Sequence, residues 1–192
     1  LQQLVRDSLQ KTINHYKAES GLAVVMEVNT GQIISSVSLP DYNPQNKKTY
    51  KENNLINRVI QSNYEMGSTF KPITAAIGFD LGIITPNMKF DVTKSYLKIR
   101  DHEKYKGDGI YDVEKVIVES SNIGTAKMAI KIGKKNQKEY FNIIGFNKRL
   151  SIESKEAAKP LGNKHHWGKH ETARIGFGHG FSITPLHLIK AY

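Results

Sequence analysis

The chain has 192 residues, a net charge of +10 at neutral pH and a hydrophobic content of 39%. A chain of this length and composition can bury a core of its own, which argues against a disordered protein. It contains no cysteine, so structural disulfides and thiolate metal sites are excluded, although the compartment is left open.

We find neither a membrane-spanning run nor a signal-peptide pattern in the sequence. No apolar run approaches the roughly 20 residues that a membrane-spanning helix needs. The first residues do not resemble a signal peptide, and the chain begins at Leu1 rather than at Met. We therefore expect an excised segment whose targeting region was left out.

The positive charge comes mainly from lysine, with 23 Lys and 5 Arg. These residues are spread along the chain, and we find neither an RNP-like aromatic pattern nor helix-turn-helix spacing. We therefore expect no nucleic-acid partner. A non-catalytic module that binds an anionic polymer is the alternative that the charge alone supports.

The first third of the chain predicts a helix followed by a hairpin. Apolar residues recur at helical spacing over residues 1–17, as in an amphipathic helix. Two β-branched runs, residues 21–28 and 32–37, flank a glycine-containing turn. A helix packed on such a hairpin is typical of a layered structure of helices and sheet.

A polar stretch over residues 39–54 predicts a loop, and the next helix follows it. Gly67 permits a tight turn, and Pro72 is tolerated only in the opening turn of a helix. Ser68 is therefore predicted at a helix N-terminus, with the helix ending near Gly82.

Ser68 and Lys71 combine a hydroxyl with a base. Three residues apart, they share one face of a helix. A serine hydroxyl needs a neighbouring base to become a nucleophile, and a lysine can serve once burial lowers its pKa. The free amides of a helix N-terminus are suited to hold an oxyanion formed in acyl transfer.

The same spacing recurs at Ser8/Lys11 and at Ser95/Lys98. The first pair lies on the amphipathic N-terminal helix, and the second lies in an alternation that is typical of a strand. Both are predicted to be solvated surface. Neither has the glycine and proline that flank Ser68.

Residues 86–109 are charged and turn-rich, and their path is not fixed by the pattern. A short helix is predicted over residues 112–118, and helical periodicity resumes at Ile123. The Ser120-Ser121-Asn122 turn between them offers groups that can pass a proton and hydrogen-bond a peptide carbonyl. Helix capping is the alternative for the same three residues.

The last third of the chain predicts two more helices around an irregular segment. One covers residues 139–144, and the other begins with Thr184 as cap and Pro185 in its first position. Residues 148–170 between them are polar and irregular.

Two further patterns do not predict sites. His165, His166 and His170 lack the spacing of a metal site, so surface histidines are predicted. The glycine-rich residues 176–180 lack the third glycine of a dinucleotide-binding loop, which would fall at Phe181.

Taken together, the motifs resemble the transpeptidase domain of penicillin-binding proteins. The resemblance rests on three stretches in the expected order: Tyr-Glu-Met-Gly-Ser-Thr-Phe-Lys-Pro at 64–72, Ser-Ser-Asn-Ile-Gly at 120–124, and Gly-Phe-Gly-His-Gly-Phe-Ser-Ile-Thr-Pro-Leu at 176–186. Asp41-Tyr42-Asn43-Pro44 and Asn57-Arg58 fit as well. Ser-Ser-Asn-Ile-Gly and Ile99-Arg100-Asp101 resemble the class B, division-associated (septal) enzymes.

This resemblance implies a fold and an extent. The fold class is α/β (α+β), of the serine β-lactamase/transpeptidase type, with helices packed on an antiparallel sheet. Without internal repeats or a linker, residues 1–192 are expected to form one partial transpeptidase domain.

It also implies a reaction. Ser68 would attack the D-Ala-D-Ala carbonyl of a peptidoglycan stem peptide, release the last D-alanine and form an acyl-enzyme, while Lys71 takes its proton. Ser120 would relay the proton to the leaving amine, and Asn122 would hydrogen-bond the peptide carbonyl of the substrate. An amine of a second stem would then complete the cross-link. β-Lactams would imitate the substrate and stay bound, and no cofactor or metal is implied.

The sequence departs from the family pattern at two points. Met66 stands where many relatives have proline. No Lys-Thr-Gly or Lys-Ser-Gly occurs, and in the family this third motif follows the Thr-Pro-Leu helix, so we expect it beyond Tyr192. The fragment alone is expected to react poorly or not at all with β-lactams, because half of the oxyanion hole is missing.

The resemblance places the protein at the periplasmic or extracytoplasmic face of the cytoplasmic (inner) membrane, held by an anchor absent from this fragment. The expected partners are peptidoglycan stem peptides, β-lactam antibiotics and division-complex membrane proteins. A serine β-lactamase or β-lactam sensor is the alternative enzyme. Glu153 and Glu156 fall where class A β-lactamases carry their hydrolytic glutamate, but the surrounding pattern is absent.

Overall fold

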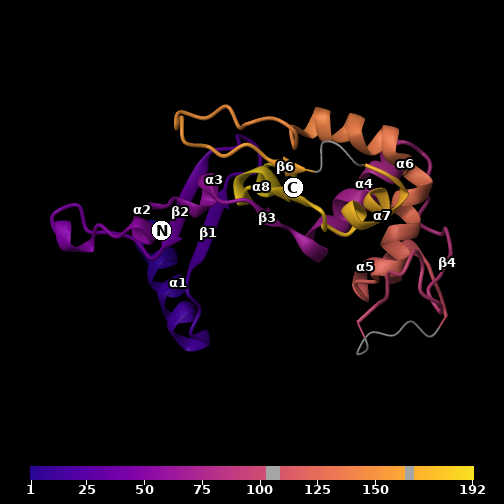
Figure 1. Ribbon diagram of the computed structural model, residues 1–192, viewed down its shortest axis with the longest axis horizontal. Coiled ribbons are helices and arrows are strands. Elements are labelled where there is room, and N and C mark those ends of the chain that lie inside the picture. The colour runs from indigo at the N-terminus through magenta and orange to yellow at the C-terminus, as the bar shows by residue number, and fades with distance from the viewer. Residues whose placement is uncertain (103–108, 163–166) are drawn as a thin grey trace. The chain divides into compact units, whose positions relative to one another are not determined.

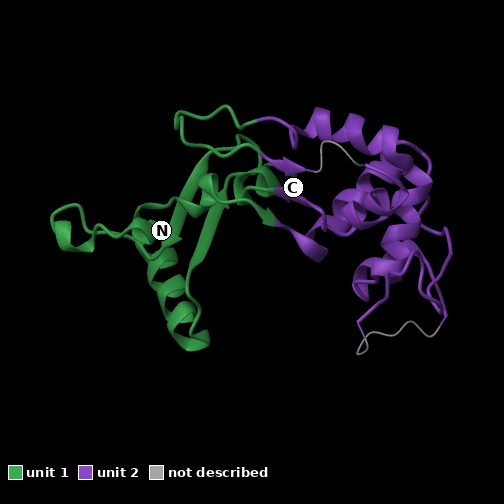
Figure 2. Cartoon of the chain, in the orientation of Figure 1, with its two compact units in different colours: residues 1–64, 149–159, 183–192 green, residues 65–148, 160–182 purple. Residues whose placement is uncertain are grey.

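The computed structural model describes residues 1–102, 109–162 and 167–192 (Figure 1). They form two compact units (Figure 2). Residues 1–64, 149–159 and 183–192 make the first unit, and residues 65–148 and 160–182 make the second.

The first unit holds α1 (Gln2–Tyr16), β1 (Gly21–Met26), β2 (Ile33–Leu39), η1 (Lys47–Thr49), α2 (Glu52–Leu55), α3 (Arg58–Gln61) and α8 (Pro185–Ala191). The second holds η2 (Gly67–Phe70), α4 (Lys71–Asp80), β4 (Phe90–Asp91), β5 (Ile110–Tyr111), α5 (Val113–Val118), α6 (Asn122–Ile144), β6 (Leu161–Gly162) and α7 (Lys169–Gly176). The short strands β3 (Tyr64–Glu65) and β7 (Phe181–Ile183) lie where the chain passes from one unit to the other.

The predicted N-terminal helix and hairpin are confirmed. β1 and β2 pair antiparallel, with Gly21 opposite Leu39. The Gln2 side chain fixes α1 to β2, because its carboxamide donates to Ser36 O at 2.7 Å and accepts from Ser35 Oγ at 2.8 Å.

The core of the first unit gathers apolar side chains from the hairpin, α3 and α8. Val59, Ile60 and Leu186 are buried at its centre. The partly buried residues packed against them are Leu22, Val24, Met26, Leu150, Ile152 and Ile189. Thr184 caps α8 as predicted, since its Oγ1 accepts from His187 N at 3.3 Å.

The stretch predicted as a loop, residues 39–54, contains the short helices η1 and α2. Asn46 starts η1 by accepting a hydrogen bond from Lys48 N at 3.1 Å. An asparagine at this position supplies the cap that a short polar turn needs, and hydrophobic periodicity does not reveal it.

The helix predicted from Ser68 onward begins differently from expectation. Ser68 lies in the 3₁₀ turn η2, and the α-helix α4 starts at Lys71, with Pro72 in its first turn. A 3₁₀ turn is frequent at the N-terminus of an α-helix. Ser68 therefore lies just before α4 instead of inside it.

The helix α6 joins two segments that the pattern predicts separately. It runs through Gly133, whose φ of 81° lies outside the helical region, and it kinks there. Glycine adopts such a φ without steric cost, so the two helical patterns continue across the kink.

Small residues let the helices of the second unit approach closely. A Cβ on Gly176 would lie 2.5 Å from Ala129 Cβ, and one on Gly124 would lie 2.5 Å from Val116 Cγ2. These contacts set α7 and α5 against α6. The buried Thr74 hydroxyl of α4 donates to Gly176 O at 2.7 Å, which ties α4 to α7.

Aromatic rings fill the interior beneath the Ser68 turn. Phe70, at the end of η2, packs against Phe141 and Phe146 with ring centroids 5.6 and 5.5 Å apart. Phe181 lies 5.0 Å from Phe141. This cluster fixes the position from which α4 begins.

Residues 90–100 have a strand-like sequence, but only Phe90 and Asp91 form a strand, which pairs with β5. Leu97 and Lys98 have positive φ, and Tyr96 bridges Ile99 across a tight turn. The prediction of a strand through Ser95 and Lys98 is therefore wrong there, while their predicted exposure is confirmed.

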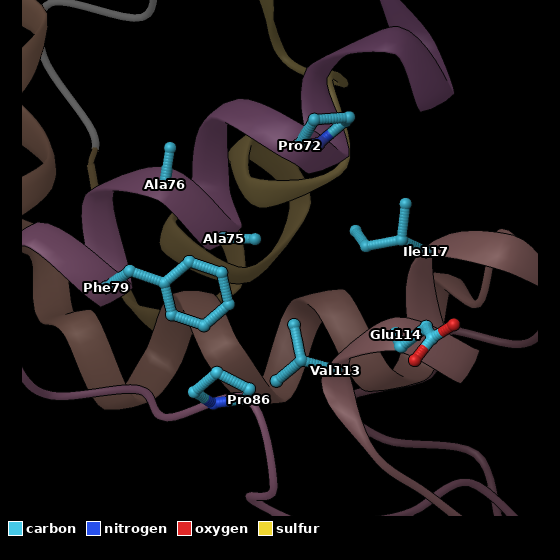
Figure 3. A pocket seen from close by; sticks show the side chains of 8 residues that line it. All are labelled: Pro72, Ala75, Ala76, Phe79, Pro86, Val113, Glu114 and Ile117. Carbon is cyan, nitrogen blue, oxygen red and sulfur yellow. The ribbon is translucent and has the colours of Figure 1, made fainter.

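Residues of α4 and α5, with Pro86 between them in sequence, line an open apolar pocket of about 380 Å³ (Figure 3). It is lined by Pro72, Ala75, Ala76, Phe79, Pro86, Val113, Glu114 and Ile117.

None of the helices in the described ranges combines the length and the apolar character that crossing a membrane requires.

Candidate active site

The turn that carries Ser68 is held by the glycine-rich segment after α7. Gly67 N donates to Gly178 O at 3.1 Å, and Gly180 N donates to Glu65 Oε1 at 2.6 Å. A Cβ on Gly178 would lie 2.3 Å from Gly67 O, so only glycine fits there. Both backbones are fixed against each other, and the Ser68 side chain is left exposed.

Lys71 extends from the first turn of α4 and is buried, with 2% of its surface exposed. Its ammonium donates to Ser120 Oγ at 2.8 Å and also to the Ser120 carbonyl. Burial lowers the pKa of Lys71 to about 8, against a smaller opposing effect of the Asp101 carboxylate. Burial favours the neutral amine, which is the form that can accept a proton.

Ser120 lies between Lys71 and Ser68. Its hydroxyl donates to Ser68 Oγ at 3.0 Å while it accepts from the Lys71 ammonium. Its φ of 52° lies in the left-handed region, which is uncommon for a serine and turns this side chain out of the helix that follows. The three side chains thus form one continuous hydrogen-bonded chain.

Capping of α6 is the task of one residue in the Ser120-Ser121-Asn122 turn. Ser121 is the N-cap of α6, because its Oγ accepts from Gly124 N at 2.9 Å. Ser120 makes no part of this cap and is directed to Lys71 and Ser68. The capping alternative therefore holds for Ser121, and the role predicted for Ser120 stays a prediction.

Asp101 supports this turn, and sequence reasoning assigned it no role in the site. Its carboxylate accepts from Ser121 Oγ at 2.7 Å and from Ile123 N at 3.0 Å. An acid at a helix N-terminus is favoured by the free amides and the helix dipole. Asp101 and Ser121 are 20 residues apart in the sequence, so no local motif could have predicted this contact.

Asn122 is the first residue of α6 and is partly buried. Its side-chain amide donates to Arg100 O at 3.3 Å. The structure therefore links Lys71 to Ser68 through the Ser120 hydroxyl. Asn122 lies two residues further along the same turn, outside that chain.

The described residues include no group of three or more potential metal ligands. His170 is exposed on α7. His165 and His166 lie outside the described residues.

The geometry places an exposed serine hydroxyl within reach of a possible base. A hydroxyl that is exposed to solvent is connected through a second hydroxyl to a buried lysine, and the helix α4 begins directly behind it. Such an arrangement can remove a proton from the nucleophile during attack on a carbonyl. The free amides near the helix N-terminus can stabilise the negative charge that develops there.

The chain belongs to the penicillin-binding protein transpeptidase domain family, whose pattern it matches over residues 21–192. The resemblance inferred from the motifs and the predicted fold class are thereby confirmed.

Curated relatives and solved structures agree with this family. The chain is 35% identical to the probable peptidoglycan D,D-transpeptidase FtsI of Caulobacter vibrioides and 29% identical to the peptidoglycan D,D-transpeptidase FtsI of Escherichia coli K12. Each match covers the whole chain and 33% of the relative. The chain therefore spans about a third of the length of these proteins.

Two solved structures share the fold. The TP domain of penicillin-binding protein 3 from Burkholderia pseudomallei matches with a TM-score of 0.84 and 27% identity, over the whole chain and 54% of that structure. A peptidoglycan glycosyltransferase from Burkholderia ambifaria matches with a TM-score of 0.85 and 28% identity, over the whole chain and 57% of that structure.

Proposed function

We propose that this chain supplies the nucleophile of a peptidoglycan D,D-transpeptidase that acts through a serine acyl-enzyme. The observation that carries the proposal is the continuous chain from the Lys71 amine through Ser120 to the Ser68 hydroxyl. The family match and the names of the curated relatives support the same reaction class.

In the proposed reaction, Ser68 attacks the carbonyl of a D-Ala-D-Ala bond. Its proton passes to Ser120 while the Ser120 proton passes to the neutral Lys71 amine, because Ser120 lies between the two groups. The acyl-enzyme forms, and the terminal D-alanine leaves with a proton returned through Ser120. An amine of a second stem peptide then attacks the ester and releases Ser68.

Asn122 is proposed to bind substrate through its side-chain amide. In the structure this amide donates only one long hydrogen bond, 3.3 Å to Arg100 O, among the contacts of the described residues. A substrate carbonyl could replace that partner with little loss, since a hydrogen bond of this length is weak. Asn122 is therefore a group that orients the substrate and takes no proton.

The biological setting is proposed from the relatives. Two of them carry the name FtsI, and we infer a role in septal wall synthesis with membrane proteins of the division complex as partners. β-Lactams are proposed to acylate Ser68, and the site is proposed to face the periplasm or cell exterior, because peptidoglycan is the substrate.

The test is a transpeptidation assay on the protein at its native length. A peptide ending in D-Ala-D-Ala is incubated with an amine acceptor, and mass spectrometry follows free D-alanine and the new amide. We expect both products, and Ser68→Ala should abolish them. The control is Ser95→Ala, because Ser95 has the same spacing to a lysine and is exposed.

Two outcomes would contradict the proposal. One is product formation that survives Ser68→Ala. The other is catalytic turnover of a chromogenic β-lactam at many equivalents per protein, which would identify a β-lactamase instead.

A further inference from the structure

The second unit contains a basic hollow that takes no part in the Ser68 site. It has a volume of about 400 Å³ and lies where β4 and the turn after it meet α6. The lining residues are Met88, Lys89, Phe90, Asp91, Tyr96, Lys127, Ile130 and Lys131. We call this feature the basic hollow.

Its charged lining residues are mostly basic. Three lysines and one carboxylate, that of Asp91, line the hollow beside four uncharged residues. The Asp91 Oδ1 atom already accepts from Thr93 N at 2.9 Å and from Thr93 Oγ1 at 2.5 Å. The carboxylate is thus engaged by Thr93, and it offsets the three lysines only in part.

The lysines differ in how well they are neutralised. Lys89 forms an ion pair with Asp112 at 3.0 Å. Lys131 is exposed and, among the residues that the structure describes, has no carboxylate within ion-pair distance. Its charge is available to an incoming anion.

Lys127 is held in place by an uncharged backbone carbonyl and an aromatic ring, and the nearby Asp91 carboxylate offsets part of its charge. Its ammonium lies 5.4 Å from the centre of the Tyr96 ring and donates to Asp91 O. A backbone carbonyl carries no net charge, and a lysine ammonium has three donors, so at least one remains for a ligand. Holding the side chain beforehand reduces the conformational entropy that binding would cost.

The apolar part of the lining adds a second kind of contact. Phe90 is 4% exposed and forms the buried part, and Ile130 and the Tyr96 ring are partly accessible. Ligand sites commonly combine an apolar floor with a few polar groups that fix orientation. The basic hollow has both features.

The geometry points to a binding site for an oxyanion, a phosphate or carboxylate group, carried on a molecule whose apolar or ring portion covers Tyr96 and Ile130. Lysine ammonium groups are point charges that accept such anions without demanding one geometry. Lys127 lies five residues after Asn122, about 7.5 Å along the axis of α6. The hollow shares no lining residue with the Ser68 site, and the proposed binding goes beyond the proposed acyl transfer.

The test measures anion binding directly, without any enzymatic assay. Isothermal titration calorimetry at low salt uses sodium pyrophosphate and, separately, sodium succinate as probes. Co-sedimentation with phosphatidylglycerol vesicles, against phosphatidylcholine vesicles, tests whether a lipid headgroup is the source of the phosphate. We expect saturable one-to-one binding of at least one of these anionic probes.

The variant Lys131→Gln should weaken that binding by about fivefold, since it removes one charge from the basic hollow. The matched control is Lys135→Gln, because Lys135 is an exposed lysine on the same helix that does not line the hollow. An unchanged affinity in this control supports the site. Equal weakening by both variants, or no saturable binding of any probe, would overturn the proposal.

Discussion

In the proposed reaction, the environment of Lys71 controls how readily Ser68 reacts. With the ordinary lysine pKa of 10.5, fewer than about one amine in a thousand is neutral at pH 7. With a pKa of about 8, about one in ten is neutral. Burial on α4 therefore raises the population of the proton-accepting form by more than a hundredfold.

The rate of Ser68 acylation by a β-lactam should consequently depend on pH. The neutral amine is the active form, so the rate should rise with pH and reach half its plateau near pH 8. The quantity to measure is the second-order rate constant for acylation of the protein at its native length, from pH 6 to pH 10. Rapid mixing followed by a chemical quench and mass spectrometry gives this constant.

The variant Asp101→Asn refines this prediction. The Asp101 carboxylate raises the pKa of Lys71, so its removal should move the midpoint to lower pH. The control is Asp112→Asn, since Asp112 also caps a helix, accepting from Lys115 N at 2.9 Å. That variant should leave the midpoint in place. An unmoved midpoint in Asp101→Asn, or a wild-type midpoint near 10.5, would contradict the assigned role of Lys71.

At the scale of elements, the site depends on two backbone segments that touch. The 3₁₀ turn η2 presents Ser68, and the segment after α7 supports it through Gly67 and Gly178. The same α7 is tied to α4 through Thr74 and to α6 through the close approach at Gly176. The position of Ser68 is therefore set by packing between helices, in addition to the local sequence.

Gly178→Ala should distort this contact. The position has a φ of 81°, and the new Cβ would lie 2.3 Å from Gly67 O. We expect a loss of at least about 3 kcal/mol in the free energy of unfolding, because backbone strain and a backbone clash add. Denaturant unfolding measures the loss, and slower β-lactam acylation should accompany it.

The matched control is Gly180→Ala, in the same segment. Its φ is 79°, but a Cβ there would meet nothing within 4 Å. Only the conformational strain remains, so the expected loss is about 1 kcal/mol. Equal losses for the two variants would show that the Gly67–Gly178 contact does not determine the position of the turn.

At the scale of the whole molecule, local patterns predicted most of the elements. The apolar spacing of α1, the β-branched runs of β1 and β2, and the cap at Thr184 are read within a few residues of sequence. Such signals are local because β-branching favours a strand and a cap satisfies the first amides of its own helix. The spacing of Ser68 and Lys71 is also read locally, but their connection through Ser120 depends on a residue about 50 positions away.

The supporting contacts of the site could not be predicted in this way. Asp101 reaches Ser121 across 20 residues, and Gly178 reaches Gly67 across 111. Such contacts depend on tertiary packing and leave no periodic signal. The 3₁₀ geometry of η2 and the kink at Gly133 were missed for a related reason, because packing of the neighbouring segments selects them.

The central claim is that the Ser68 hydroxyl is the nucleophile of an acyl transfer. The most direct measurement is peptide mapping of the protein at its native length after reaction with a penicillin. We predict one penicillin adduct per protein, located on Ser68, absent in Ser68→Ala and retained in Ser95→Ala. An adduct on another residue, or labelling that persists in Ser68→Ala, would contradict the account.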